Sequence, residues 1–307
     1  MAIDLSVDLG RFQLKNPVMT ASGTFGYGYE YHQIYDIAQL GAVVVKGIAP
    51  FASCGNPTPR VAETASGMLN AIGLQGPGVD QFIHGEHYLP FLRTTGAAVI
   101  VNIWGKTIAD YCEVAARLKA ERDALTALEI NISCPNVKAG GVAFGTDLKL
   151  LGEVVSAVRK ATTLPLITKL SPNVTRIGDF ARAAADSGSD AVSLINTITG
   201  MAIDVETRRP KIANLTGGLS GPAIKPVAVR MVYEAAHAVS IPVIGMGGIM
   251  TGDDAVEFLL AGARAVAVGT AIFNDPCAPL KVIDGIRDYL ERHGCKSIRE
   301  IIGALEV

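Results

Sequence analysis

SIPVIGMGGI at residues 240–249 and GARAVAVGTAI at residues 262–272 set the pattern of this chain. Each contains a short apolar run that ends in glycine, and apolar residues at helical spacing lie between the two. Similar runs recur along the sequence, and their alternation with helical stretches predicts parallel strands joined by helices. We expect the strands at residues 17–20, 42–46, 98–103, 127–132, 166–170, 191–195, 242–246 and 265–269.

Eight such strands predict an α/β fold of the (β/α)8 or TIM-barrel type. A barrel of this kind uses roughly 200 to more than 400 residues as one unit, and this chain has 307. We therefore expect a single domain over residues 1–307. The connecting helices are expected to include residues 108–121, 148–161, 177–186, 227–239 and 253–261.

Two segments, residues 47–95 and 196–226, are too long to be plain connections. Both follow the carboxyl ends of predicted strands, the face on which barrels build their active sites, so we expect substrate loops or lids there. The opening residues 5–14 resemble a small hairpin that turns at Gly10 and caps the opposite end.

Composition excludes several classes of partner. The formal net charge is −2 and the basic residues are scattered, which argues against nucleic acid. No apolar run approaches the ~18 residues that span a bilayer, and the first residues lack the pattern of a signal peptide. We expect a cytoplasmic protein. The five cysteines, at positions 54, 112, 134, 277 and 295, form no CxxC pair, so neither a disulfide framework nor a metal site is expected.

Glycines follow the last two predicted strands, as Gly247-Gly248 and Gly269-Thr270, and Gly221 could join them. Glycine lets backbone N–H groups come close to an anion, and this is where barrels commonly bind phosphate. The same glycines could instead serve packing alone. The pattern favours a phosphate-bearing ligand without naming it.

Polar residues also close several apolar strands. Lys46 and Lys169 end the runs GAVVVK and PLITK, where burial of an ammonium is costly unless an anion compensates for it. Both could instead extend to solvent at the rim. A set of asparagines lies at or just past strand ends or in the first long insert, and amides suit the edge of an imide-containing ring; the set is Asn70, Asn102, Asn131, Asn136 and Asn196.

Cys134 lies two residues past the expected strand 127–132. A thiol at the mouth of a barrel could act as a nucleophile or as an acid or base, because its pKa is readily tuned toward neutral pH. No histidine is near it in sequence, which favours acid–base work over acyl transfer.

Several motifs together resemble the class 1 dihydroorotate dehydrogenases, from about Leu5 to the C-terminus. They are NISCPNVKAGG at 131–141, MLNAIGLQGPG at 68–78, LSPN at 170–173, INTITG at 195–200, GGLSGPAIKP at 217–226 and IGMGGI at 244–249. The resemblance implies oxidation of dihydroorotate to orotate, in pyrimidine biosynthesis, on an FMN held in the barrel.

The resemblance also assigns roles to residues. It implies that Cys134 is the base that removes the C5 proton and that Lys169 stabilises negative charge on the reduced flavin. It implies an FMN site made of Ser22, Lys46, Gly47, Asn102, Asn131, Lys169, Ile195, Gly221, Gly247, Gly248, Gly269 and Thr270. The implied substrate site consists of Lys46, Asn70, Ala71, Ile72, Gly73, Leu74, Asn131, Asn196 and Thr197.

Within the family, a cysteine base without an N-terminal extension is typical of class 1, and the segments NAIGLQGPG and NVKAGGVAFG resemble the NAD-linked type 1B. That type implies a partner subunit with FAD and a [2Fe-2S] cluster, in a heterotetramer built on a homodimer. In agreement, no GxGxxG motif follows a strand here. Trp104, close to Asn102, could alter the rim, but we expect it to pack.

Other functions stay open at this stage. One is the fumarate-using type 1A enzyme. Another FMN barrel that reduces a pyrimidine is also compatible, although an RNA-acting one would need a basic surface. A non-redox isomerase or aldolase could bind a sugar phosphate at the same glycines. A yellow protein that releases flavin would separate the redox functions from the last one.

Overall fold

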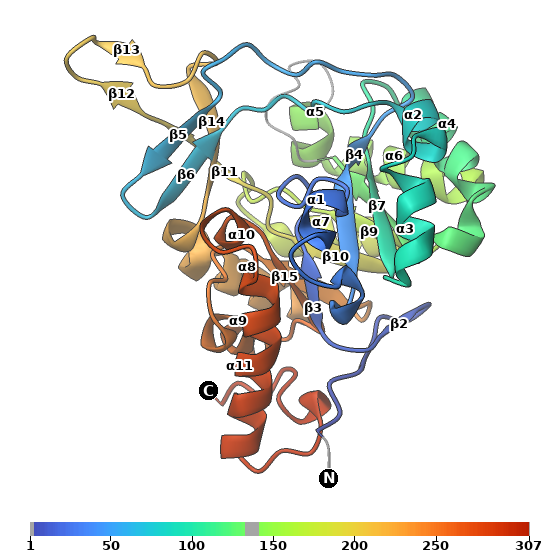
Figure 1. The fold of residues 1–307 in the computed structure, drawn as a ribbon, viewed down its shortest axis with the longest axis vertical. Coiled ribbons are helices and arrows are strands. Elements are labelled where there is room, and N and C mark those ends of the chain that lie inside the picture. Colours follow the sequence, from blue (N-terminus) through green and yellow to red (C-terminus); the bar gives the residue numbers. More distant parts are fainter. Residues whose placement is uncertain (1–2, 133–140, 307) are drawn as a thin grey trace.

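The computed structural model describes residues 3–132 and 141–306. Its centre is an eight-stranded parallel sheet (Figure 1). In spatial order the strands are β3 (Val18–Thr20), β16 (Ala265–Val268), β15 (Val243–Met246), β10 (Ala191–Leu194), β9 (Leu166–Lys169), β8 (Ala127–Asn131), β7 (Val99–Ile103) and β4 (Val43–Ile48). A parallel bridge between Met19 and Ala42 joins the first strand to the last and closes the sheet. The predicted (β/α)8 barrel is confirmed.

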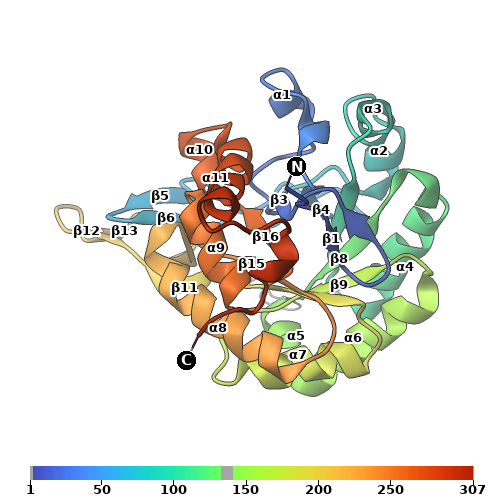
Figure 2. The same cartoon turned by 90° about the horizontal axis from the view of Figure 1, so that it is seen from below.

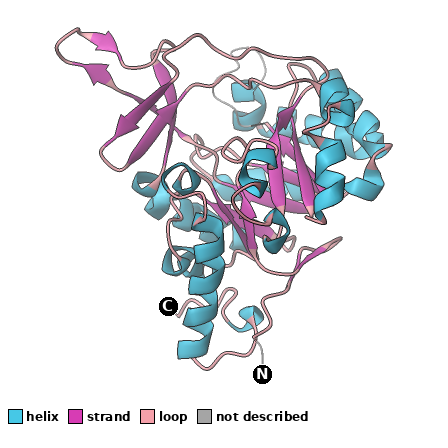
Figure 3. Cartoon of the chain, viewed as in Figure 1, coloured by secondary structure: helices cyan, strands magenta, loops and turns pink. Residues whose placement is uncertain are grey.

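Helices surround this barrel, as Figure 2 shows from below. The outer ring contains α4 (Ile108–Lys119), α6 (Leu148–Ala161), α7 (Ile177–Asp186), α8 (Lys225–Ala238), α9 (Gly252–Leu260) and α11 (Ala278–Arg292). Figure 3 shows the helices outside the strands. Because helices cover the outer face and side chains fill the inner one, every residue of β7, β8, β9, β10, β15 and β16 is buried.

The expected N-terminal hairpin is present. Strands β1 (Val7–Asp8) and β2 (Gln13–Leu14) pair antiparallel, and Gly10 in the turn has φ 82, a backbone conformation that favours glycine. A bridge from Asp4 to Ser297 joins this region to the end of the chain. Figure 1 shows both termini at the bottom, away from the carboxyl ends of the barrel strands.

The two long inserts fold together, which the sequence did not indicate. Strands β5 (Val61–Thr64) and β6 (Gly67–Asn70) come from the first insert, and β11 (Ile198–Met201) and β14 (Thr216–Ser220) from the second. They form one antiparallel sheet in the order β11-β14-β6-β5, at the upper left of Figure 1. Beyond it projects a hairpin of β12 (Ile203–Asp204) and β13 (Arg209–Pro210).

The seam between the inserts is tight. In the β14–β6 pair, Ser220 lies opposite Met68. A Cβ added to Gly67 would lie 1.9 Å from the Ser220 carbonyl oxygen, so only glycine allows this approach. Part of what we expected to be loops is therefore a paired sheet, and other residues of the same inserts, such as Ile72 and Asn196, line the cavity as loops.

Shorter elements complete the fold. In the first half of the chain these are α1 (Tyr29–His32), the 3-10 turns η1 (Ile37–Gln39) and η2 (Arg122–Ala124), α2 (Val79–His84), α3 (Leu89–Thr95) and α5 (Gly141–Thr146). In the second half they are η3 (Pro222–Ile224), α10 (Ala271–Asn274) and η4 (Ile298–Glu300).

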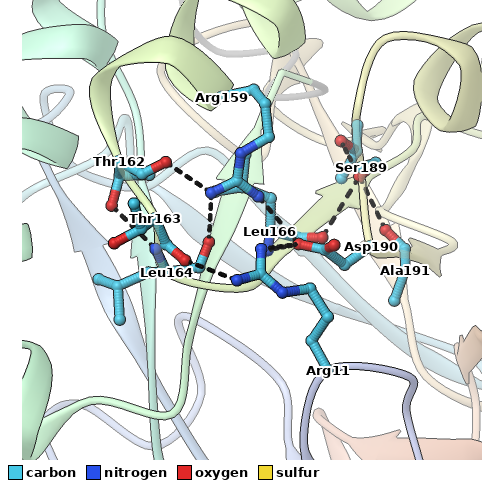
Figure 4. A network of polar contacts seen from close by, with 10 residues as sticks. Arg11, Arg159, Thr162, Thr163, Leu164, Leu166, Ser189, Asp190 and Ala191 are labelled. Atoms are coloured by element: carbon cyan, nitrogen blue, oxygen red, sulfur yellow. Dashed lines mark hydrogen bonds and ion pairs between the residues drawn. The ribbon is translucent and has the colours of Figure 1, made fainter.

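Asp190 organises a polar network where β9 and β10 begin, shown in Figure 4. Its carboxylate accepts hydrogen bonds from the Leu166 N–H at 2.8 Å and from Arg159 Nη1 at 3.0 Å. Arg159 Nη2 donates to the carbonyls of Thr162 and Leu164. Burial lowers the pKa of Arg159, and the charge of Asp190 opposes that shift. The network fixes the amino-terminal ends of two barrel strands.

Asp190→Ala is therefore expected to lower the free energy of unfolding by about 2–4 kcal/mol, because it leaves a strand N–H and a partly buried guanidinium unpaired. Urea denaturation measures the change. Asp288→Ala, at an exposed position of α11, is the matched control and should cost less than about 0.5 kcal/mol. Equal stability of the two variants would contradict the role given to Asp190.

Candidate functional site

A cavity of ≈ 270 Å³ opens at the carboxyl ends of the barrel strands. Its wall combines strand ends with residues of both inserts, as expected for the functional face of a barrel. The residues proposed from the sequence that line it are Ser22, Lys46, Gly47, Asn70, Ile72, Gly73, Leu74, Asn102, Asn131, Lys169, Ile195, Asn196, Thr197, Gly221, Gly247, Gly248, Gly269 and Thr270.

Ala71 differs from its neighbours in the segment 70–74. It does not line the cavity, and its side chain is completely buried. Its carbonyl oxygen accepts a hydrogen bond from Asn56 Nδ2 at 3.0 Å. In this structure Ala71 supports the segment rather than contributing its side chain to the cavity.

Cys134 lies outside the described residues, and so does Asn136. Asn131, three positions before the cysteine, lines the cavity, and its carbonyl oxygen accepts a hydrogen bond from the Tyr111 hydroxyl at 2.9 Å. The role of Cys134 stays a prediction from the sequence.

Behind the lining residues Asn102 and Lys169 lies a buried polar group that the sequence analysis missed. Glu129 on β8 accepts a hydrogen bond from Asn102 Nδ2 at 2.6 Å, and Lys169 Nζ lies 3.8 Å from its Oε2. Ser193 Oγ donates to Glu129 Oε1 at 2.7 Å. The available signal was the position of Glu129 in the run LEIN, two residues before Asn131 and thus on the same face of the strand.

Lys46 occupies a different part of the wall. Its side chain is partly buried, and burial is the main cause that lowers its pKa, with the charge of Arg60 adding to the shift. Nearby, the Ser22 hydroxyl donates to the Val45 carbonyl at 2.9 Å. The lining residues that the structure describes include the cations Lys46 and Lys169 and no carboxylate, so the cavity favours an anionic ligand.

Three glycines form a narrow cradle at one side of the cavity. Gly221, Gly247 and Gly248 have φ values of 95, 127 and 80, which side chains disfavour. A Cβ on Gly248 would lie 2.8 Å from the Gly221 carbonyl oxygen. Beside the cradle, the Thr270 hydroxyl donates to Ser220 Oγ at 2.8 Å. The absence of side chains lets a ligand approach the backbone closely.

Asn173, the last residue of the motif LSPN, supports the start of the second insert. Its Nδ2 donates to the Thr197 carbonyl at 3.2 Å, and its Oδ1 accepts from the Thr199 N–H at 3.0 Å. Next to Thr197, the carbonyl of Gly218 accepts a hydrogen bond from Asn70 Nδ2 at 3.4 Å. These bonds hold polar residues of the two inserts at the same opening.

The sequence analysis named Ile72, Leu74 and Ile195 but missed the rest of the apolar lining. It includes Val61, Met68, Met246, Ile249, Met250 and Phe273. Met68, Met246 and Ile249 lie in the quoted motifs but carry no polar group that would mark them as site residues, and only the fold brings the six to one wall. They give the cavity the apolar surface that a flat ring system requires.

Trp104 packs in the interior and does not line the cavity. Its ring stands edge-on to Phe51 with centroids 5.5 Å apart. The expected packing role agrees with this geometry. A Cβ on Gly47 would lie 2.9 Å from both the Trp104 ring and Asn102 Oδ1, so glycine is required between the tryptophan and the cavity.

Two searches were made over the part of the chain that the structure describes. No helix there has the length and apolar character needed to cross a membrane. No three or more histidine, cysteine, aspartate or glutamate side chains gather there in a way that could hold a metal ion.

Comparison with known proteins gives one consistent result. The dihydroorotate dehydrogenase family model matches residues 4–290. The chain is 58% identical over 304 residues to a Bacteroides thetaiotaomicron protein and 59% identical over 304 residues to one from Alkaliphilus metalliredigens, with 99% of each chain covered. Both are named dihydroorotate dehydrogenase B (NAD(+)), catalytic subunit.

A solved structure agrees with them. The crystal structure of DHODH from Eimeria tenella in complex with ferulenol superimposes with a TM-score of 0.83 at 25% identity, covering 98% of this chain and 88% of that one. The resemblance found in the motifs is thus confirmed over nearly the whole sequence. The chain belongs to the dihydroorotate dehydrogenase family.

Proposed function

We propose that this chain oxidises dihydroorotate to orotate in pyrimidine biosynthesis, with FMN as its resident cofactor and residues 1–307 acting as one domain. The observation that carries the proposal is the cavity, which joins two lysines, a glycine cradle and a buried amide acceptor in one site. Family membership and the names of the relatives support it.

The residues present fit FMN on three counts. The cradle of Gly221, Gly247 and Gly248 suits a phosphate. The oxygen of the Asn102 side chain is buried without a hydrogen-bond partner among the described residues, and it suits an imide N–H. Lys169 places a positive charge in the cavity wall, which would stabilise the negative charge of a reduced ring. When bound, FMN would supply the acceptor for two electrons and one hydrogen.

In the proposed reaction, dihydroorotate would give up the C6 hydrogen with its electron pair, which bound FMN would accept, and the C5 proton to a base, and the C5–C6 double bond of orotate would remain. The proposed base is the Cys134 thiolate. Lys46, Asn131 and the first insert would hold the substrate, with Asn196 and Thr197 opposite them. Amides can pair with the donors and acceptors of a pyrimidine, and Lys46 can pair with a carboxylate.

We further propose that the electrons pass to NAD through a partner subunit that carries FAD and a [2Fe-2S] cluster, in a cytoplasmic heterotetramer built on a homodimer. The relatives' names, each a catalytic subunit of an NAD(+) enzyme, support this type over the fumarate-using one. The isolated chain should then reduce artificial acceptors but not NAD.

The test begins with purified protein, which should be yellow and release FMN on denaturation. Anaerobic dihydroorotate should bleach the flavin band and yield orotate. A colourless protein that cannot take up FMN would contradict every redox function, including oxidation of another pyrimidine. A flavoprotein that dihydroorotate leaves oxidised would contradict the substrate alone.

The lowered pKa of Lys46 predicts a pH dependence of orotate binding. Because burial lowers that pKa from the ordinary value of 10.5, the ammonium loses its charge at a lower pH than a free lysine does. The affinity for the orotate anion should be highest at pH values below the pKa of Lys46, where the ammonium is charged. It should fall by roughly 3-fold or more as the pH rises through that lowered pKa. Flavin absorbance changes on orotate titration measure the dissociation constant.

Lys46→Arg is the matched control, because arginine keeps its charge over this range. In this variant, the pH dependence of the dissociation constant comes from the ionisation of orotate itself and of groups other than residue 46. The difference between the wild-type and variant pH profiles therefore gives the contribution of Lys46. Parallel profiles would contradict the assignment.

A further inference from the structure

Glu129 and Lys169 are the charged residues that the described part of the chain buries. Their exposed fractions are 3% and 5%. Removing two charges from water costs several kcal/mol per ion unless each is paired and hydrogen-bonded. Lys169 faces the cavity and has a role in the proposed function, whereas Glu129 lies beneath the wall and has none. Its burial calls for an explanation.

The carboxylate of Glu129 contacts three side chains from three neighbouring strands. Asn102 on β7 donates to Oε2, Ser193 on β10 donates to Oε1, and Lys169 on β9 lies 3.8 Å from Oε2. A carboxylate only accepts hydrogen bonds. Asn102 must therefore turn its NH₂ toward Glu129, and this fixes the orientation of the amide.

The other end of that amide is buried at the cavity wall. Asn102 lines the cavity, and its Oδ1 is buried with no hydrogen-bond partner among the described residues. It lies beside Gly47, which is also in the wall. By holding the NH₂, Glu129 fixes this oxygen as an unpaired acceptor next to the wall residue Gly47.

Glu129 is also the counter-charge of Lys169. The strands next to β9 present Glu129 and Asn131 from β8 and Ser193 from β10, and Asn102 follows on β7. The other charged group in the described wall is Lys46, a second cation. Without Glu129, no carboxylate within ion-pair distance among the described residues would balance the Lys169 ammonium.

We propose that Glu129 is a positioning residue for flavin reduction: it keeps Lys169 charged before electrons arrive and turns the oxygen of Asn102 toward the cofactor. The inference rests on the proposed FMN chemistry. It predicts how many protons accompany the electrons. Two electrons and one proton give a ring with one negative charge, and in the wild type the charge of Lys169 is already in place.

Glu129→Gln removes the charge and keeps the shape. A lone buried ammonium beside a neutral oxidised ring would release its proton to solvent and recover it when the ring becomes negative. Reduction would then take up two protons for two electrons instead of one. The slope of the midpoint potential against pH counts these protons, and it should become about twice as steep in the variant.

The experiment measures that slope on holoprotein between about pH 7 and 9, with reduction by dithionite in equilibrium with a reference dye. Glu129→Asp, which keeps the charge, should retain the wild-type slope. Glu234→Gln, which removes a partly exposed carboxylate paired with Arg230 on α8, controls for net charge and should also match the wild type. A residue that only fills space would leave all slopes equal, and equal slopes would overturn the inference.

A second measurement covers the case in which Glu129→Gln does not fold. In wild-type oxidised holoprotein with ¹⁵N-labelled lysine, the Nζ signal absent from Lys169→Met should have the chemical shift of an ammonium at about pH 8. The shift of a neutral amine there would overturn the inference. Neither measurement uses dihydroorotate, so failure of the substrate assignment is seen separately, in the bleaching test.

Discussion

Cys134→Ser should keep bound FMN but slow its reduction by dihydroorotate by roughly 10²-fold or more near neutral pH. A thiol has a pKa close enough to neutrality to be tuned into a thiolate, whereas a serine hydroxyl is a far poorer base without added help. Anaerobic stopped-flow absorbance of the flavin band measures the rate. The expectation comes from the sequence, because the structure describes the chain only up to residue 132 before this cysteine and again from residue 141.

Cys54→Ser is the matched control, since Cys54 is exposed and does not line the cavity. It should reduce its flavin at the wild-type rate. If Cys134→Ser does the same, the base is another group. A rate that recovers at alkaline pH in Cys134→Ser would instead support the assignment, because it shows a base of higher pKa in the same position.

Lys169→Ala should lose both function and stability. The cavity loses a cation where the reduced ring needs one, so FMN retention or flavin reduction should fall. The structure adds a second effect: Glu129 is left as a buried, unbalanced carboxylate, which costs roughly 3–5 kcal/mol of folding free energy. Flavin content, anaerobic reduction and urea denaturation measure the three quantities.

A double variant separates the two effects. Lys169→Met with Glu129→Leu replaces the ion pair by apolar side chains of similar volume, which often restores stability. It should be more stable than Lys169→Ala and still reduce its flavin poorly, although it stays below wild-type stability because Asn102 and Ser193 lose their hydrogen-bond acceptor. Normal flavin occupancy, turnover and stability in Lys169→Ala would show that this lysine is a rim residue after all.

The barrel was predictable because its strands are buried on both faces. Short apolar runs such as GAVVVK and PLITK between helical stretches indicate buried parallel strands. The observed strands β4 and β9 begin within a residue of the predicted ones and end within two residues of them. The sheet of the inserts was not predictable in this way. Its strands GMLN and TGGLS are short and contain glycine, and they pair with each other although they lie more than a hundred residues apart in the sequence.

The candidate site divides along a similar line. Lys46 and Lys169 could be found because a charge at the end of an apolar run is conspicuous. Glu129 lies inside the apolar run LEIN, and its role in the site depends on three partners from other strands. The family resemblance placed Ala71 in the site with its neighbours, although its buried side chain does not line the cavity. Only the fold distinguishes these cases.

The antiparallel pairing of β6 with β14 limits how the two inserts can be exchanged in chimeras and how they can vary among relatives. Because each insert supplies strands that the other needs, the two behave as one interchangeable module although they are separate in sequence. A chimera that exchanges only residues 47–95 with a relative would bring mismatched neighbours to the close approach at Gly67. Exchanges that alter substrate choice should therefore transplant both segments together, and lengths should change in concert across the family.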